Sequence, residues 1–201
     1  YAGKRGGKPS EKQSDITLRL VELAEAGKCV LRLKGGDPFM FGRGAEECMA
    51  LADRGIRFRI VPGITAGIGG LAYAGIPATS RHTNHAVIFL TGHDETGSVP
   101  AAVDWDAVAN AAPVIVMYMA VKHLRSIAER LLAAGRSPRD PITVVINASL
   151  PDQYVVHSWL GKVEFIEHML AAPAIVVLGP VGLMRQQLDW YVGQLRENGL
   201  G

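Results

Sequence analysis

The chain has 201 residues, which is enough to bury a sizeable core in one large domain or in two smaller ones. Its 48% hydrophobic and 20% charged residues are typical of a soluble globular protein, and no apolar run reaches the length of a membrane span. A net charge of +2 is too small to argue for a nucleic-acid partner. The two cysteines, Cys29 and Cys48, indicate free thiols in a reducing compartment, so we expect a cytoplasmic protein without a nucleic-acid or membrane partner.

The first part of the chain alternates between helical spacing of apolar residues and short apolar runs that are typical of buried strands. The expected elements are a helix from Glu11 to Gly27 behind the capping-box pair Ser10 and Gln13, a strand over 29–33, a helix over 45–54, a strand over 58–61 and a helix over 66–74. This order favours a parallel α/β layer with helices on both faces.

A polar, proline-broken stretch at residues 76–85 predicts a linker, so we divide the chain into domains 1–80 and 81–201. The second domain is expected to contain strands over 86–91, 114–119, 142–146, 154–159 and 174–178, with helices over 122–134, 162–171 and 183–196. Several of these strands follow one another without a helix between them. The sequence therefore predicts an α/β protein whose second half has a mixed sheet.

The stretch Lys34-Gly35-Gly36-Asp37-Pro38 directly follows the first apolar run. Glycines let the backbone approach a ligand closely, and Asp37 brings a carboxylate to the carboxyl end of a predicted strand, where α/β proteins bind their ligands. An ordinary surface turn would explain the same residues. The neighbouring motifs decide between these interpretations.

Several motifs stand in a fixed order: GKRGG at 3–7, RLKGGDPF at 32–39, FGRG at 41–44, VPGITA at 61–66 and AGIP at 74–77. In this order and spacing they resemble the uroporphyrinogen-III C-methyltransferases of the tetrapyrrole methylase family. LTGH at 90–93 and YM at 118–119 extend the resemblance, which covers essentially the whole chain.

The resemblance implies two α/β domains of the tetrapyrrole methylase type, with the active site in the trough between them, and a homodimer. It also implies S-adenosylmethionine as the methyl donor, S-adenosylhomocysteine as a product and a small-molecule tetrapyrrole as the substrate. The implied reaction is two successive methyl transfers to uroporphyrinogen III, which give precorrin-2 for siroheme and cobalamin biosynthesis.

Carried over residue by residue, the family's cofactor contacts fall on Gly35, Gly36, Asp37, Met40, Thr65, Ala66, Met119, Ala148 and Ala174. Read alone, Met119, Ala148 and Ala174 would be ordinary core residues. Small residues in a loop would offer backbone groups to the cofactor, and Asp37 could accept hydrogen bonds from its hydroxyl or ammonium groups.

For catalysis, Lys4 falls on the family's lysine for proton transfer, because a proton must leave the pyrrole ring after the methyl group arrives. Arg5 and Arg81 are candidates to bind the carboxylates of the substrate, since a guanidinium pairs with a carboxylate bidentately. His82 and His85 have no partners at ligand spacing, so we expect no metal site.

Two departures from the family pattern bear on function. Ser80 stands where the family has a histidine, and the chain begins at Tyr1 without the family's first strand and its Gly-x-Gly-Pro-Gly-Asp loop, so it looks like a fragment. Two alternatives stay open, the first because later-precorrin methyltransferases share the Gly-Gly-Asp-Pro loop and the second because of the missing start. The protein could methylate a later precorrin, or it could be a non-catalytic module that binds S-adenosylmethionine or a tetrapyrrole.

Overall fold

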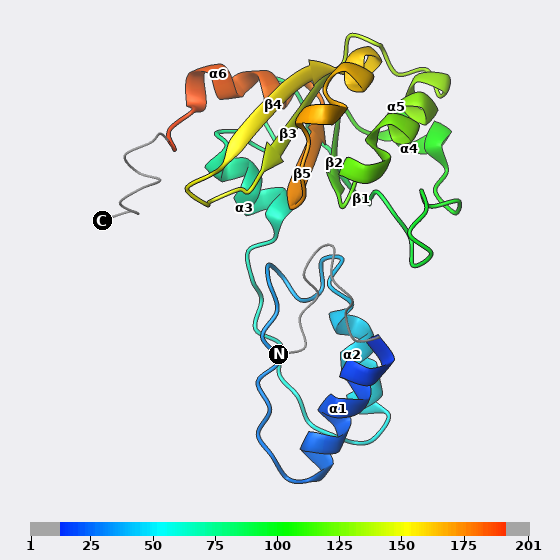
Figure 1. Ribbon diagram of the computed structural model, residues 1–201, viewed down its shortest axis with the longest axis vertical. Coiled ribbons are helices and arrows are strands. Elements are labelled where there is room, and N and C mark those ends of the chain that lie inside the picture. Colours follow the sequence, from blue (N-terminus) through cyan, green and yellow to red (C-terminus); the bar gives the residue numbers. More distant parts are fainter. Residues whose placement is uncertain (1–12, 192–201) are drawn as a thin grey trace. The chain divides into compact units, whose positions relative to one another are not determined.

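Figure 1 shows the protein as a computed structural model, in which residues 13–191 are described. The chain divides into two units, Tyr1–Thr65 and Ala66–Gly201. This division precedes helix α3 (Ala66–Tyr73), whereas the sequence placed the boundary after residue 80. The helix belongs to the second unit because it packs against two strands of that unit's sheet. The functional domains 1–80 and 81–201 stay a prediction.

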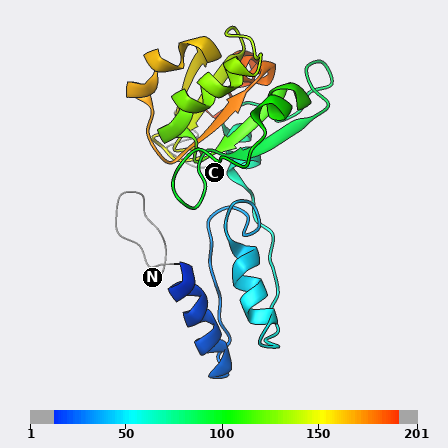
Figure 2. The same cartoon turned by 90° about the vertical axis from the view of Figure 1, so that its right-hand side faces the viewer.

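In the first unit, helices α1 (Gln13–Glu25) and α2 (Gly44–Ala52) pack against each other (Figures 1 and 2). Helix α1 buries Ile16 and Val21. It ends as predicted before Gly27, whose φ of 76° is the left-handed conformation that glycine adopts easily at a helix end. The predicted start at Glu11 and its cap at Ser10 lie outside the described residues.

The strands predicted over 29–33 and 58–61 are wrong, and so is the parallel layer expected around them. The described part of the first unit contains no strand, and the side chains of Leu31 and Leu33 are 86% and 81% exposed. An apolar run forms a strand only when a neighbouring segment pairs with its backbone N–H and C=O groups. Residues 13–65 supply no such partner.

The second unit is built on a five-stranded sheet with the order β1-β2-β5-β3-β4 (Figure 1). The strands are β1 (Val87–Thr91), β2 (Val114–Tyr118), β3 (Pro141–Ile146), β4 (Tyr154–Trp159) and β5 (Ala174–Leu178). Strands β1 and β2 are parallel and the other pairs are antiparallel, which confirms the predicted mixed sheet.

Helix α4 (Trp105–Ala111), which was not predicted from the sequence, connects the parallel strands β1 and β2. Its start is fixed by Asp104, whose side chain accepts a hydrogen bond from the N–H of Ala107 at 2.9 Å. The helix predicted over 122–134 is present as the 3-10 turn η1 (Val121–His123) followed by α5 (Leu124–Ala133).

The helix predicted over 162–171 is wrong, because this segment forms two 3-10 turns, η2 (Leu160–Phe165) and η3 (Glu167–Met169). The last predicted helix, over 183–196, is shorter in the described residues. It consists of the 3-10 turn η4 (Pro180–Met184) and of α6 (Arg185–Leu188). Its predicted continuation beyond residue 191 lies outside the described part.

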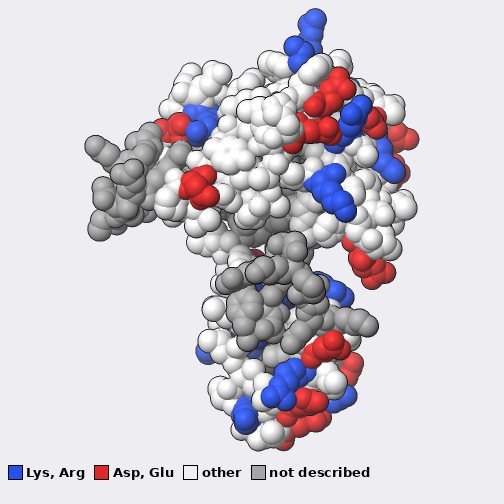
Figure 3. Space-filling model, viewed as in Figure 1, with Lys and Arg blue, Asp and Glu red and all other residues white. Residues whose placement is uncertain are grey.

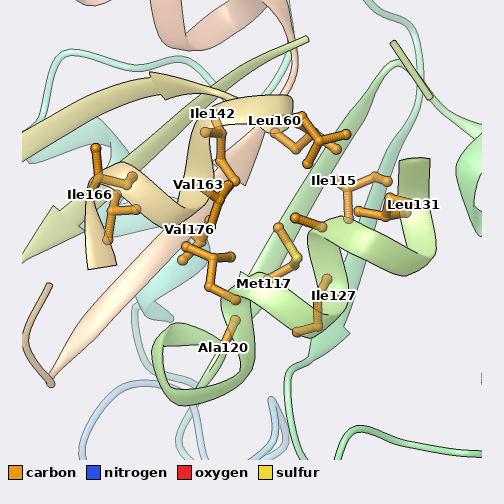
Figure 4. Close-up of a cluster of buried hydrophobic side chains, with 14 of the residues drawn as sticks. Ile115, Met117, Ala120, Ile127, Leu131, Ile142, Leu160, Val163, Ile166 and Val176 are labelled. Carbon is orange, nitrogen blue, oxygen red and sulfur yellow. The ribbon is translucent and has the colours of Figure 1, made fainter. Parts of the chain in front are cut away.

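The hydrophobic core of the second unit joins the sheet to α5 and η2 (Figure 4). Its buried members include Ile115, Met117, Ala120, Ile127, Leu131, Ile142, Leu160, Val163, Ile166 and Val176. None of the helices in the described residues is long and apolar enough to cross a bilayer. On the visible face of each unit, Lys and Arg side chains are interspersed with Asp and Glu (Figure 3).

Candidate functional site

In the first unit, Asp37 holds together the loop that follows Lys34. Its Oδ1 atom accepts the N–H of Phe39 at 2.8 Å, and its Oδ2 atom accepts the N–H of Gly63 at 3.0 Å. The N–H groups of Gly63 and then Phe39, with a smaller contribution from Met40, lower the pKa of the Asp37 carboxyl below its usual value. The side chain is therefore ionised at neutral pH and links two segments of the unit.

The glycines of this region have different surroundings. A Cβ atom on Gly63 would overlap the carbonyl oxygen of Gly36, so only glycine allows these two backbones to touch. Gly36 itself has a φ of 72°, and a Cβ atom on it would lie 3.8 Å from the Cα atom of Thr65. In contrast, a Cβ atom on Gly35 would have no neighbour within 4 Å. The loop is thus closed toward Gly63 and open at Gly35.

The segment that leads into the loop is fastened to α2 by Glu47, which is only 4% exposed. Its Oε1 atom lies 3.0 Å from Nζ of Lys34 and 3.3 Å from Nη2 of Arg32, and it accepts a hydrogen bond from Gln13 at 2.8 Å. This cluster was not predicted from the sequence. The alternation of Arg32 and Lys34 was the available signal, because residues two apart in an extended segment point to the same side.

In the second unit, the carboxyl ends of β2 and β3 meet the amino end of β5. Strand β5 is antiparallel to both neighbours, so that Tyr118 pairs with Ile175 and Ile146 pairs with Ala174. The residues that follow β2 and β3 therefore lie at the same end of the sheet as Ala174. Met119 directly follows β2 and is 43% exposed, so it is not the core residue that its type would suggest.

Helix α3 begins at this end of the sheet. The N–H of Gly67 donates to the hydroxyl of Tyr118 at 2.8 Å. A Cβ atom on Gly70 would lie 3.2 Å from Cβ of Ala148 and 4.0 Å from Cβ of Ala66. The small residues of α3 therefore allow the helix to approach the loop after β3.

The backbone has left-handed residues in the loop after Lys34 and in the loops after β2 and β3. In the described part of the chain, the non-glycine residues with positive φ are Phe41, Arg43, Met119, Asn147 and Ser149. Each of them is one of the predicted cofactor residues or lies within a few positions of one. Left-handed conformations of non-glycine residues are costly and cluster at functional sites, which supports all three of these loops as binding elements.

The predicted cofactor residues thus form two sets. The first unit brings together Gly35, Gly36, Asp37, Met40 and Thr65, and the second brings together Ala66, Met119, Ala148 and Ala174. Both sets combine small residues with left-handed turns. This chemistry fits a ligand that is held through main-chain hydrogen bonds.

The remaining predictions concern the catalytic residue, the substrate-binding residues and the metal site. Lys4 and Arg5 lie outside the described residues. Arg81 is exposed on a separate loop, which Asn84 closes by accepting the N–H of Ser80 at 3.1 Å and donating to the carbonyl of Ala78 at 3.0 Å. Within residues 13–191 no group of three or more His, Cys, Asp and Glu side chains could hold a metal ion.

A comparison with protein families matches residues 2–164 to the tetrapyrrole (corrin/porphyrin) methylases. A uroporphyrinogen-III C-methyltransferase of a Sinorhizobium species is 59% identical over 192 residues, which cover 94% of this chain and 69% of that protein. A siroheme synthase of Baumannia cicadellinicola subsp. Homalodisca coagulata is 41% identical over 98% of this chain, which spans only 42% of that longer protein.

Solved structures give the same picture. A uroporphyrin-III C-methyl transferase from Thermus thermophilus, complexed with S-adenyl homocysteine, superposes with a TM-score of 0.75 at 37% identity over 84% of this chain and 74% of that one. A cobalt precorrin-4 methyltransferase has a TM-score of 0.74 at 23% identity over 88% of this chain and 73% of that one. The second likeness shows the fold alone, and both confirm the predicted α/β class.

Proposed function

Because this chain belongs to the tetrapyrrole (corrin/porphyrin) methylase family, we propose that it transfers methyl groups from S-adenosylmethionine to carbon atoms of uroporphyrinogen III. Two successive transfers would give precorrin-2, which feeds siroheme and cobalamin biosynthesis. The observation that carries this proposal is the 59% identity to a uroporphyrinogen-III C-methyltransferase across 94% of the chain.

The two sets of residues suit a nucleoside-containing, zwitterionic ligand. In the first unit, the open space at Gly35 lets a ligand reach the backbone. The Asp37 oxygens hold Phe39 and Gly63 and have further lone pairs for a hydroxyl or ammonium group. In the second unit, Met119 is 43% exposed, and Ala148 has a side chain of only one methyl group. We propose that each set contributes contacts to S-adenosylmethionine.

S-adenosylmethionine supplies a methyl group on a sulfonium, which is already a reactive electrophile, and S-adenosylhomocysteine is left after the transfer. The largest contribution of the protein is then to place the donor and the acceptor carbon in line. We propose that Lys4 assists the loss of the ring proton that follows, and that Arg5 and Arg81 bind carboxylates of the substrate.

Three further proposals complete the assignment. Functional domains 1–80 and 81–201, which differ from the two structural units, are proposed from the polar, proline-broken stretch at residues 76–85. A homodimer is proposed from the family resemblance. A cytoplasmic location is supported by the free thiols of Cys29 and Cys48. Analytical ultracentrifugation of the purified protein would test the dimer.

The proposal is tested by incubating the purified full-length protein anaerobically with uroporphyrinogen III and S-adenosylmethionine. We expect a product heavier than the substrate by two methyl groups and an equivalent amount of S-adenosylhomocysteine, both measured by mass spectrometry. A reaction without the methyl donor is the control. No methylated product, together with tight S-adenosylhomocysteine binding, would favour the non-catalytic module; methylation of precorrin-2 alone would favour the later-precorrin enzyme.

A further inference from the structure

The loop that carries Ala148 has an unusual backbone on both sides of that residue. Asn147 has a φ of 49° and Ser149 a φ of 69°, so each is in the left-handed region. Asparagine tolerates this conformation better than serine does. Such a turn persists only where its surroundings hold it, and the structure shows which groups do so.

Gln153 holds the amide side of Ser149. Its side chain is 2% exposed, and its Oε1 atom accepts the N–H of Ser149 at 2.7 Å. Its Nε2 atom donates to the carbonyl oxygen of Tyr73 at 3.1 Å, at the end of α3. One buried amide therefore links the loop to the helix that begins at Ala66.

Tyr191 holds the carbonyl side of Ser149. Its hydroxyl donates to the Ser149 carbonyl oxygen at 2.9 Å, and its side chain is 5% exposed. Its ring meets the ring of Tyr73 edge to face, with centroids 4.9 Å apart. The preceding Trp190 donates through Nε1 to the carbonyl oxygen of Ala72 at 2.8 Å, which seats this segment on α3.

Neighbouring contacts tie the same loop to the start of β5. The N–H of Asn147 donates to the carbonyl oxygen of Pro173 at 3.1 Å, directly before Ala174. The side-chain amide of Asn147 donates to Asp152 at 2.6 Å. Ala148 thus lies between two residues whose backbone groups are bonded to distant parts of the unit.

We infer that Gln153 and Tyr191 are positioning residues for S-adenosylmethionine. By bonding the N–H and C=O groups of Ser149, they hold the peptide between Ala148 and Ser149 and so fix the direction in which Ala148 presents its C=O group. The inference rests on the proposed function, because it takes Ala148 as a cofactor contact. Neither Gln153 nor Tyr191 is assigned a contact with the cofactor.

The test compares two variants that each lose a phenol hydroxyl bonded to a backbone carbonyl. Tyr191→Phe loses the bond to Ser149, whereas the control Tyr154→Phe loses a bond of 3.0 Å to the carbonyl oxygen of Met169. S-adenosylhomocysteine is titrated into the full-length protein by calorimetry. We expect Tyr191→Phe to raise the Kd roughly three- to tenfold, as for the loss of one hydrogen bond, and Tyr154→Phe to leave it unchanged.

Kinetics and hydrogen exchange separate positioning from general stability. In Tyr191→Phe the KM for S-adenosylmethionine should rise by the same factor as the Kd, while the KM for the tetrapyrrole stays constant. Gln153→Met removes both amide bonds, so the Ser149 amide should exchange faster without ligand. If Gln153→Met does not fold, the milder Tyr191→Phe still decides the matter.

The outcomes distinguish this inference from the proposed function. If the wild-type protein neither binds S-adenosylhomocysteine nor methylates, the proposed function fails and the inference falls with it. If the wild type binds and Tyr191→Phe binds equally tightly, the inference is overturned while the proposed function stands. Equal weakening in Tyr191→Phe and Tyr154→Phe would also overturn it, because the effect would then be general.

Discussion

The Oδ2 atom of Asp37 accepts the N–H of Gly63 at 3.0 Å, so one carboxylate joins two segments that lie 26 positions apart. Its other oxygen holds the N–H of Phe39 inside the loop. An aspartate suits this place because a short side chain with two acceptor oxygens can serve both segments at once. The acid of the Gly-Gly-Asp-Pro loop therefore has a structural task in addition to any contact with a ligand.

Replacing this carboxylate should remove an acid-sensitive contact. Backbone N–H groups lower the pKa of Asp37, so its stabilising effect is complete above the usual value of 3.8 and is lost as the pH falls through the lower pKa of the folded state. An NMR titration should show the Gly63 amide signal moving with a midpoint below 3.8. In Asp37→Asn this step should be absent. A Gly63 signal that titrates identically in the variant would contradict the bond.

Gly63→Ala should destabilise the first unit, because the new methyl group would overlap the carbonyl oxygen of Gly36, so that one of the two backbones must shift. A loss of about 1–3 kcal/mol in the free energy of unfolding is expected for such overpacking. Chemical denaturation measures it.

Gly35→Ala is the matched control, since a Cβ atom there has open space around it. Its unfolding free energy should stay close to that of the wild type, whereas its affinity for S-adenosylhomocysteine should fall if the ligand approaches this backbone. Equal stability losses in the two variants would show that the close approach of Gly63 to Gly36 is not the cause.

Tyr118→Phe should loosen the start of α3. The variant leaves the buried N–H of Gly67 without the hydroxyl that accepts it at 2.8 Å. An unsatisfied buried donor costs about 1–3 kcal/mol of unfolding free energy. Urea denaturation checks this value, and Tyr154→Phe, whose side chain is 40% exposed, should lose less. An unchanged midpoint for Tyr118→Phe would be evidence against this bond.

Stability of the second unit should fall in mildly acidic solution because of His157. His157 is exposed as a whole residue, but partial desolvation of its ring, and then the positive charge of Arg185, lower its pKa below 6.5. Its Nδ1 atom lies 2.9 Å from Oγ1 of the buried Thr143. The folded state thus disfavours the protonated ring, so stability is complete above about pH 6.5 and declines as the pH falls through the lower pKa. Unfolding at pH values of about 7.5 and 5.5 measures the decline, which His157→Gln should reduce. An equally steep decline in the variant would contradict this assignment.

Strands β2 and β5 were predictable because they are continuous apolar runs that are almost entirely buried, such as Val114–Tyr118. The failed helix over 162–171 also left a signal. The buried residues Leu160, Val163 and Ile166 are spaced by three, which is the period of the 3-10 turn that forms there. Helix α4 was missed because seven residues hold too few turns for a periodic pattern.

The candidate site was located from motif order, but its supporting contacts were not. Local sequence cannot show that Tyr191 reaches Ser149 or that Tyr118 reaches Gly67, because each bond joins positions far apart in the chain. The strands expected in the first unit failed for a related reason. Apolar character indicated burial, but burial also requires a partner, and residues 13–65 do not provide one.

The order of the sheet has a consequence for biosynthesis. Strand β5 is synthesised last among the strands yet lies between β2 and β3. Until residues 174–178 have been made, the β1–β2 pair and the β3–β4 hairpin share no strand, and both expose unpaired edges. The sheet of the second unit therefore closes only after β5 has been synthesised. A nascent chain that stalls before β5 exposes the unpaired edges of the β1–β2 pair and of the β3–β4 hairpin to chaperones.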